Sequence, residues 1–111
     1  MAPSAEYKTY VLELLEKFGN VRTARFFGGV GLRLDSTQFA MIMGNNLYFV
    51  VDDTVRDKYK RAGMQPFSYL TKNGRVQVRR YYEVPEDVLN DPDQLRRWAS
   101  ESVRIASLPK R

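Results

Sequence analysis

Residues 38–51 read QFAMIM-GNN-LYFVV, which is two short runs of β-favouring residues on either side of a Gly-Asn-Asn break. In both runs the two sets of alternating side chains are apolar, so each strand would be apolar on both faces. Strands of this kind lie in the middle of a sheet that is covered on both sides. A similar run at residues 30–34 predicts the strand that precedes them.

A second hairpin is predicted downstream, from strands at residues 67–71 and 76–82. Asn73 and Gly74 lie between them, and Asn-Gly readily takes the positive φ angles that a two-residue hairpin turn requires. A turn formed by these two residues would pair Tyr69 with Val78.

Three helices are predicted from apolar side chains at helical spacing. The first covers residues 5–18 after the capping residue Ser4. The second lies between Asp53 and Gly63, since acidic residues favour a helix start and glycine favours a helix end. The third begins after the capping residue Asp91.

The predicted order of elements is therefore α-β-β-β-α-β-β-α. No internal repeat or linker divides the 111 residues, and a chain of this length buries enough surface to form one core. We expect a single α+β domain over residues 1–111. It would have two layers, with an antiparallel five-stranded sheet and helices, and Trp98 of the last helix would pack against the sheet.

The side-chain inventory limits the chemistry that is available. The chain contains no cysteine and no histidine, which excludes thiolate nucleophiles, imidazole acid–base catalysis and metal sites built from Cys or His. The paired carboxylates stand beside predicted helix starts, where capping of backbone N–H groups explains them. We therefore predict no catalytic residue, no metal, no cofactor and no enzymatic activity.

The charge balance permits an acidic partner but does not by itself indicate one. Eighteen Lys and Arg against thirteen Asp and Glu give a net charge of +5, which would help binding to nucleic acid. Tyr81 and Tyr82 stand beside cations and resemble the stacking rings of a single-strand groove. This argument for nucleic-acid binding is weakened because Tyr81 and Tyr82 are neighbours in one strand and point to opposite faces, so they cannot both lie beside the same arginines. The candidate nucleic-acid-binding residues are Arg56, Lys60, Lys72, Arg75, Arg79 and Arg80.

A glycine-rich stretch, RFFGGVGL, occupies residues 25–32. It does not match a phosphate-binding loop, which needs Lys and Ser or Thr after its last glycine, nor a dinucleotide fingerprint, which needs a following helix. We interpret it as a tight bend or bulge where the chain enters the first strand, at which only glycine fits the backbone angle or the close approach. The residues of this structural motif are Arg25, Phe27, Gly28, Gly29 and Gly31.

One face of the sheet remains open if all three helices lie on the other. Ala40 and Ile42, together with Tyr48 and Val50, would then offer an apolar surface. We predict a homodimer through this face. The alternatives are that the last helix or the glycine-rich segment covers it.

No apolar run approaches the roughly 20 residues that are needed to cross a bilayer. Residues 1–6 also lack the charged and apolar regions of a signal peptide. We therefore expect no membrane contact and a cytoplasmic location.

Four segments together resemble the TfoX/Sxy N-terminal-domain family: residues 25–32, the strand with Phe39-Ala40, residues 47–52 and residues 81–85. The resemblance extends over roughly residues 7–105. It implies a two-layer domain similar in fold to type III secretion chaperones. It also implies a link to bacterial competence regulators, which are thought to act with the cyclic-AMP receptor protein and carry a second, C-terminal domain that these 111 residues lack.

These observations lead to two functional hypotheses. The first is a non-enzymatic interaction module, linked to transcription or DNA competence, whose partner is a protein such as a component of the transcription machinery. The alternative is direct binding of nucleic acid through the basic hairpin and the second helix.

Overall fold

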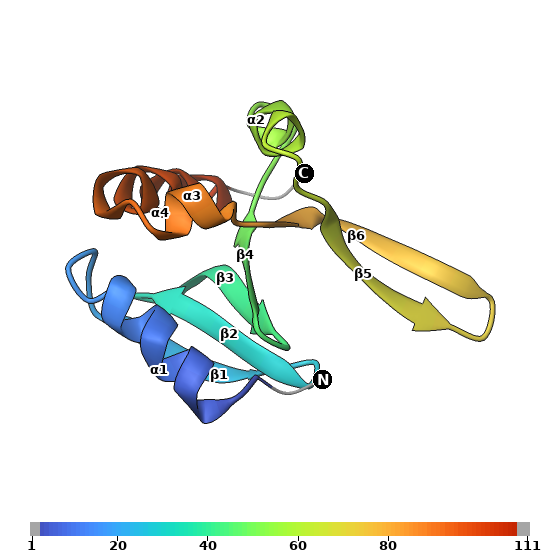
Figure 1. Cartoon of the computed structure of the whole chain (residues 1–111), viewed down its shortest axis with the longest axis horizontal. Helices are drawn as coiled ribbons and strands as arrows, with labels where there is room; N and C mark the ends of the chain where they lie inside the picture. Colours follow the sequence, from blue (N-terminus) through green and yellow to red (C-terminus); the bar gives the residue numbers. More distant parts are fainter. Residues whose placement is uncertain (1–2, 109–111) are drawn as a thin grey trace.

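The computed structural model describes residues 3–108, and within them six strands and four helices form around one antiparallel sheet (Figure 1). The strands are β1 (Val21–Phe26), β2 (Gly29–Leu34), β3 (Thr37–Met43), β4 (Asn46–Val50), β5 (Pro66–Thr71) and β6 (Gly74–Glu83), and the helices are α1 (Ala5–Leu14), α2 (Arg56–Arg61), α3 (Glu86–Leu89) and α4 (Pro92–Ala106). The strand order is β1-β2-β3-β4-β6-β5. The predicted α+β class is confirmed, but the sheet has six strands rather than five.

The additional strand is β1, at one edge of the sheet. Its two larger apolar residues, Val21 and Phe26, lie at its ends, and the four residues between them are exposed. It therefore lacks the alternation that marks a half-buried strand. The bend predicted here is in fact the turn of a hairpin, formed by Phe27 and Gly28 with φ angles of 47° and 82°.

Each of the four hairpins within residues 3–108 has a two-residue turn. In the β5–β6 hairpin the turn residues are Lys72 and Asn73 rather than Asn73 and Gly74, because Thr71 pairs with Gly74. The hydroxyl of Thr71 donates to the carbonyl oxygen of Gly74 at 2.8 Å. Each pair of the hairpin is shifted by two positions from the prediction, and an even shift leaves every side chain on its predicted face.

The predicted dimer face is not assembled, because the β3–β4 turn contains two residues, 44 and 45, instead of a three-residue Gly-Asn-Asn break. A change of one residue in loop length reverses the faces of one strand relative to the other. Ala40 pairs with Phe49, so Ala40 and Ile42 lie on the face of Phe49, while Tyr48 and Val50 lie on the other face. Ala40, Ile42 and Val50 are at most 1% exposed, and only Tyr48 is partly accessible.

Helices cover one face of the sheet. Figure 1 shows α1, α3 and α4 on one side of strands β1 to β4, with the β5–β6 hairpin projecting away from them. Phe39 packs between Phe18 and Phe49, with ring centroids 5.6 Å and 6.0 Å away. Val11 and Leu15, from α1 and the residue that follows it, are completely buried in the same core. We call the opposite side of the sheet the open face.

The predicted helix caps are present. Ser4 caps α1 by accepting a hydrogen bond from the N–H of Tyr7 at 3.1 Å, and the helix ends at Leu14, four residues earlier than predicted. Asp91 caps α4. Gln94 donates to the Asp91 carboxylate from its side-chain amide and from its backbone N–H, and these bonds, chiefly the side-chain one, hold the pKa of Asp91 below its usual value. No helix within residues 3–108 is long and apolar enough to cross a membrane.

Trp98 packs from α4 into the core cluster, but its ring is only partly buried. It meets the ring of Tyr59 at 4.7 Å, and the ammonium group of Lys58 lies 4.2 Å from its centroid. Because full burial of a tryptophan is worth about 3 to 5 kcal/mol, we expect Trp98→Ala to lower the free energy of unfolding by about 2 kcal/mol. Urea denaturation measures this loss. A change indistinguishable from zero would contradict the packing of the ring.

Candidate functional site

The glycines of β2 shape the open face. A Cβ on Gly29 would lie 2.4 Å from the carbonyl oxygen of Ile42 and 2.5 Å from Sδ of Met43. A Cβ on Gly31 would lie 2.5 Å from Oε1 of Gln38. The bare backbone of β2 therefore lets side chains of β3 lie across it. Close approach accounts for these two glycines, and the segment leads from strand to strand rather than into a phosphate-binding helix.

Phe27 stands at the tip of the β1–β2 hairpin, where it is 87% exposed and has a φ of 47°. This left-handed conformation costs a residue with a side chain about 1 to 2 kcal/mol, and turns of this kind prefer Asn, Asp or Gly. The ring contacts only its neighbour Phe26 among aromatic residues, edge to face at 4.7 Å. An exposed ring in a strained conformation does not serve the stability of the fold, which makes Phe27 a candidate contact residue.

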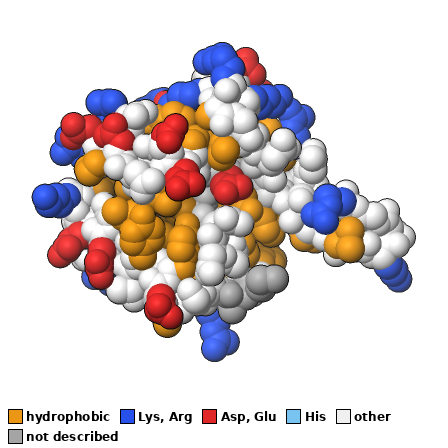
Figure 2. Space-filling view, viewed as in Figure 1, with side chains coloured by type: hydrophobic (Ala, Val, Ile, Leu, Met, Phe, Trp, Pro, Cys, Tyr) orange, Lys and Arg blue, Asp and Glu red, His pale blue; other side chains and the backbone are white. Residues whose placement is uncertain are grey.

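An apolar hollow of about 720 Å³ opens beside Phe27 on the open face. Tyr48 and Phe67 meet in it edge to face at 5.4 Å, and Phe26 approaches Tyr81 at 6.1 Å. Figure 2 shows hydrophobic side chains where the β5–β6 hairpin leaves the body and again on the hairpin itself. The larger lining side chains are Phe26, Phe27, Met41, Met43, Tyr48, Phe67, Tyr69, Val78 and Tyr81.

The polar groups of the hollow are neutral. Among residues 3–108, no Lys, Arg, Asp or Glu lines it. Burial raises the pKa of both Tyr48 and Tyr81, so their hydroxyl groups remain protonated at neutral pH. The hydroxyl of Tyr81 accepts a hydrogen bond from the side-chain amide of Gln38 at 3.1 Å. The surface therefore suits a partner that brings apolar and uncharged groups.

The β5–β6 hairpin extends the same surface outward. Within it, residues 67–71 pair with residues 74–78, and we call this segment the arm. It projects from the body (Figure 1). Near its tip, Tyr69 and Val76 on the side of the hollow are 46% and 38% exposed, and Leu70 on the opposite side is 72% exposed. The arm thus places apolar side chains where the residues of its own body do not cover them.

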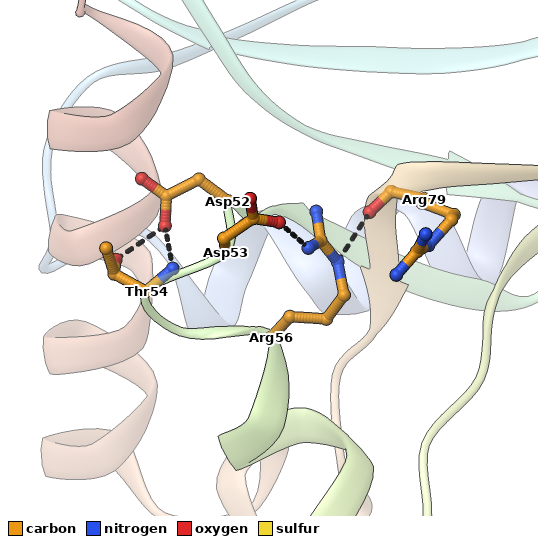
Figure 3. A network of polar contacts seen from close by, with 5 residues as sticks. All are labelled: Asp52, Asp53, Thr54, Arg56 and Arg79. Atoms are coloured by element: carbon orange, nitrogen blue, oxygen red, sulfur yellow. Dashed lines mark hydrogen bonds and ion pairs between the residues drawn. The ribbon is translucent and has the colours of Figure 1, made fainter.

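The base of the arm is tied to the loop before α2 by a polar network (Figure 3). Arg56 pairs with Asp53, and its Nε donates to the carbonyl oxygen of Arg79 at 3.4 Å. Asp52 accepts from the N–H and the hydroxyl of Thr54, and the hydroxyl bond is the main reason that the pKa of Asp52 is lowered. The side chain of Arg56 is 13% exposed, so this cation serves the junction rather than an open surface.

The other predicted nucleic-acid-binding residues are exposed: Lys60, Lys72, Arg75, Arg79 and Arg80. Figure 2 shows Lys and Arg side chains over α2 and on the arm. Tyr81 and Tyr82, however, are only 9% and 3% exposed. The two rings that the sequence offers as stacking partners for bases are therefore buried, while the cations are exposed.

Of the residues that line the hollow, the sequence singles out only Phe27, Tyr48 and Tyr81, and it assigns them to three different features. Met43 and Tyr69 come from different hairpins, and only the folded sheet brings them to one surface. The sequence did contain one indication of this surface, the pair Gly29 and Gly31. Glycines at alternate positions of a strand leave one of its faces without side chains, so that neighbouring side chains can lie across it. The prediction of a close approach at these glycines names no partner strand, because the sequence does not show which side chains would lie across them.

The protein is a small α+β domain in which helices cover one face of an antiparallel sheet. Its exposed apolar surfaces are the open face with its hollow and the projecting arm. The model of the TfoX N-terminal domain matches residues 13–106 of the chain. The chain therefore belongs to the TfoX N-terminal domain family, a competence-related family, as the resemblance of residues 25–32 and 47–52 indicated. No curated protein matches it.

Proposed function

We propose that the chain is a non-enzymatic interaction module of the cytoplasm that serves DNA competence or its transcriptional regulation by binding a protein through the open face. The observation that carries the proposal is the strained, exposed ring of Phe27 beside an uncharged hollow of about 720 Å³. Aromatic side chains next to apolar pockets are the usual anchors of protein–protein interfaces. Membership of a competence-related family supports the biological setting.

Phe27→Asn separates binding from stability. Asparagine suits the left-handed turn and relieves about 1 to 2 kcal/mol of strain, while loss of the contact with Phe26 removes about 0.5 to 1.5 kcal/mol. We expect the free energy of unfolding to stay within about 1 kcal/mol of the parent. Loss of an anchor worth about 2 kcal/mol should weaken partner binding roughly thirtyfold, and the transformation frequency of the bacterium that encodes the chain should fall accordingly.

Asp35→Asn is the matched control, because Asp35 takes the same kind of position, with a φ of 56°, in the turn of the β2–β3 hairpin. It should leave both the thermal unfolding curve and the transformation frequency unchanged. If Phe27→Asn transforms like the parent, Phe27 is not the anchor and the proposal fails.

Direct binding of nucleic acid is the second candidate, favoured by the exposed cations along the arm and β6. If Lys72, Arg75, Arg79 and Arg80 neutralised about four phosphates, log affinity would fall with log salt at a slope near −3.6 on duplex or −2.8 on single strands. Because Tyr81 and Tyr82 are buried, we expect instead only weak, non-specific binding of about 10⁻⁴ M at physiological salt.

Fluorescence anisotropy on duplex and single-stranded DNA, measured over about 50 to 200 mM salt, distinguishes the two functions. Under the proposed function, Arg79→Ala leaves the weak background nearly unchanged. Sub-micromolar binding that Arg79→Ala weakens on all sequences, with a slope smaller by about one unit, would favour the nucleic-acid function instead.

A further inference from the structure

Among the residues that the structure describes, none fills the hollow and none covers the tip of the arm. We propose that a second copy of this chain occupies the hollow, and that the two copies meet by antiparallel pairing of one β5 with the other. This inference rests on the proposed function of the hollow as a protein-binding surface, and it names the occupant.

The first argument is the chemistry of the two sheet edges. Folded proteins protect exposed edge strands with charges, prolines or bulges, because an open edge pairs with other chains. The edge strand β1 carries Arg22 and Arg25. The other edge strand, β5, reads PFSYLT and has no charged residue, with Pro66 only at its body end. β5 is therefore the edge that is left open to pairing.

The second argument is the direction of the backbone groups. Thr71 and Gly74 flank a two-residue turn, so they form a hydrogen-bonded pair, and such pairs alternate along an antiparallel ladder. Ser68 and Leu70 consequently direct their N–H and C=O groups away from β6. With a two-fold axis beside β5, these N–H and C=O groups of one copy can pair with those of a second copy. Both free edges are then used in one contact, so the assembly stops at a dimer.

The third argument connects this edge to the hollow. In an antiparallel pair of arms, the tip of each arm lies beside the base of the other. Phe67 and Val78, at the base, line the hollow. Tyr69, the outermost arm residue in the lining, is still 46% exposed, and its pairing partner Val76 near the tip is 38% exposed. One symmetry operation therefore brings the exposed apolar tip of each copy to the open hollow of its partner, and neither β5 nor the described lining of the hollow contributes a charged residue.

The charges of the arm predict how salt acts on this dimer. Lys72, Arg75, Arg79 and Arg80 are exposed on each copy, so pairing of two arms brings like charges together. Salt screens such repulsion. Association should be unchanged or strengthened as salt increases, which is the opposite of the response of a nucleic-acid complex.

Sedimentation equilibrium of the full chain at tens of micromolar tests the proposal. The parent should form a dimer of two 12.9 kDa chains. Leu70→Lys puts like charges near the two-fold axis and should weaken the dimer at least tenfold. Leu70 is 72% exposed in one copy, so the thermal unfolding of the variant should match the parent. Thr23→Lys, an exposed position on the edge strand β1, should change neither property.

Cysteine cross-linking supplies the second readout, since the chain has no cysteine of its own. Under mild oxidation, Ser68→Cys or Leu70→Cys should give a disulfide-linked dimer, and Thr23→Cys should not. A monomeric parent, a dimer that Leu70→Lys leaves intact, or linkage through Thr23→Cys alone would overturn the proposal. If the parent is monomeric while Phe27→Asn still lowers transformation, the dimer fails and the proposed function stands.

Discussion

Phe49→Ala should lower the free energy of unfolding by about 3 to 5 kcal/mol. Phe49 is completely buried in β4, packs against Phe39 at 6.0 Å, and lies between Ala40 of β3 and Tyr82 of β6 in the ladder. Truncation would leave a cavity between the sheet and the helices, where neighbours on both sides are held by strand pairing and cannot collapse into it. Urea denaturation followed by circular dichroism measures the loss.

The adjacent residue supplies a control on the opposite face. Tyr48 lines the hollow and is only partly buried, so Tyr48→Ala should cost less, about 1 to 2 kcal/mol. The difference between Phe49 and Tyr48 reports which face of β4 holds the main core. Equal losses, or a larger loss at Tyr48, would contradict the assignment of the two faces.

The central part of this fold is predictable from sequence because its signals are local. Strands β3 and β4 are apolar on both faces, and Ser4 and Asp91 cap their helices as their residue types predict. The edge strand β1 is not predictable in this way. It faces solvent over most of its length, so no periodic pattern distinguishes it from a loop. Its pairing with β2 and the packing of Val21 and Phe26 at its two ends hold it in the sheet.

The open face could not be assigned from the sequence for a different reason. When both faces of a strand pair are apolar, the pattern does not fix the register, and only the length of the turn does so. Gly-Asn-Asn accommodates either a two-residue or a three-residue loop. The two-residue turn observed separates Ala40 and Ile42 from Tyr48 and Val50. The hollow itself depends on contacts between hairpins that are distant along the chain.

The interpretation of the glycine-rich segment names a tight bend and a close approach, and the structure contains both. The turn lies at Phe27 and Gly28, and close approach requires Gly29 and Gly31 inside β2. The sequence does not reveal the backbone strain at Phe27, which precedes these glycines. There an aromatic residue takes a left-handed turn position that is usually occupied by Asn, Asp or Gly. Stability alone would favour a different residue there, which is why this position, more than the glycines, points to function.

Gly29→Val should lower the free energy of unfolding by about 3 kcal/mol, at the upper end of the usual range for overpacking. The obstacle is backbone, since the new Cβ would lie 2.4 Å from the carbonyl oxygen of Ile42, and β3 cannot retreat without breaking its pairing with β4. Gly31→Ala is the matched comparison. Its Cβ meets the flexible end of Gln38, which can move at the loss of one hydrogen bond to Tyr81, so we expect a loss of about 1 kcal/mol. Urea denaturation of both variants gives the order, and a larger loss at Gly31 would contradict the close approach of β2 and β3 on which the floor of the hollow depends.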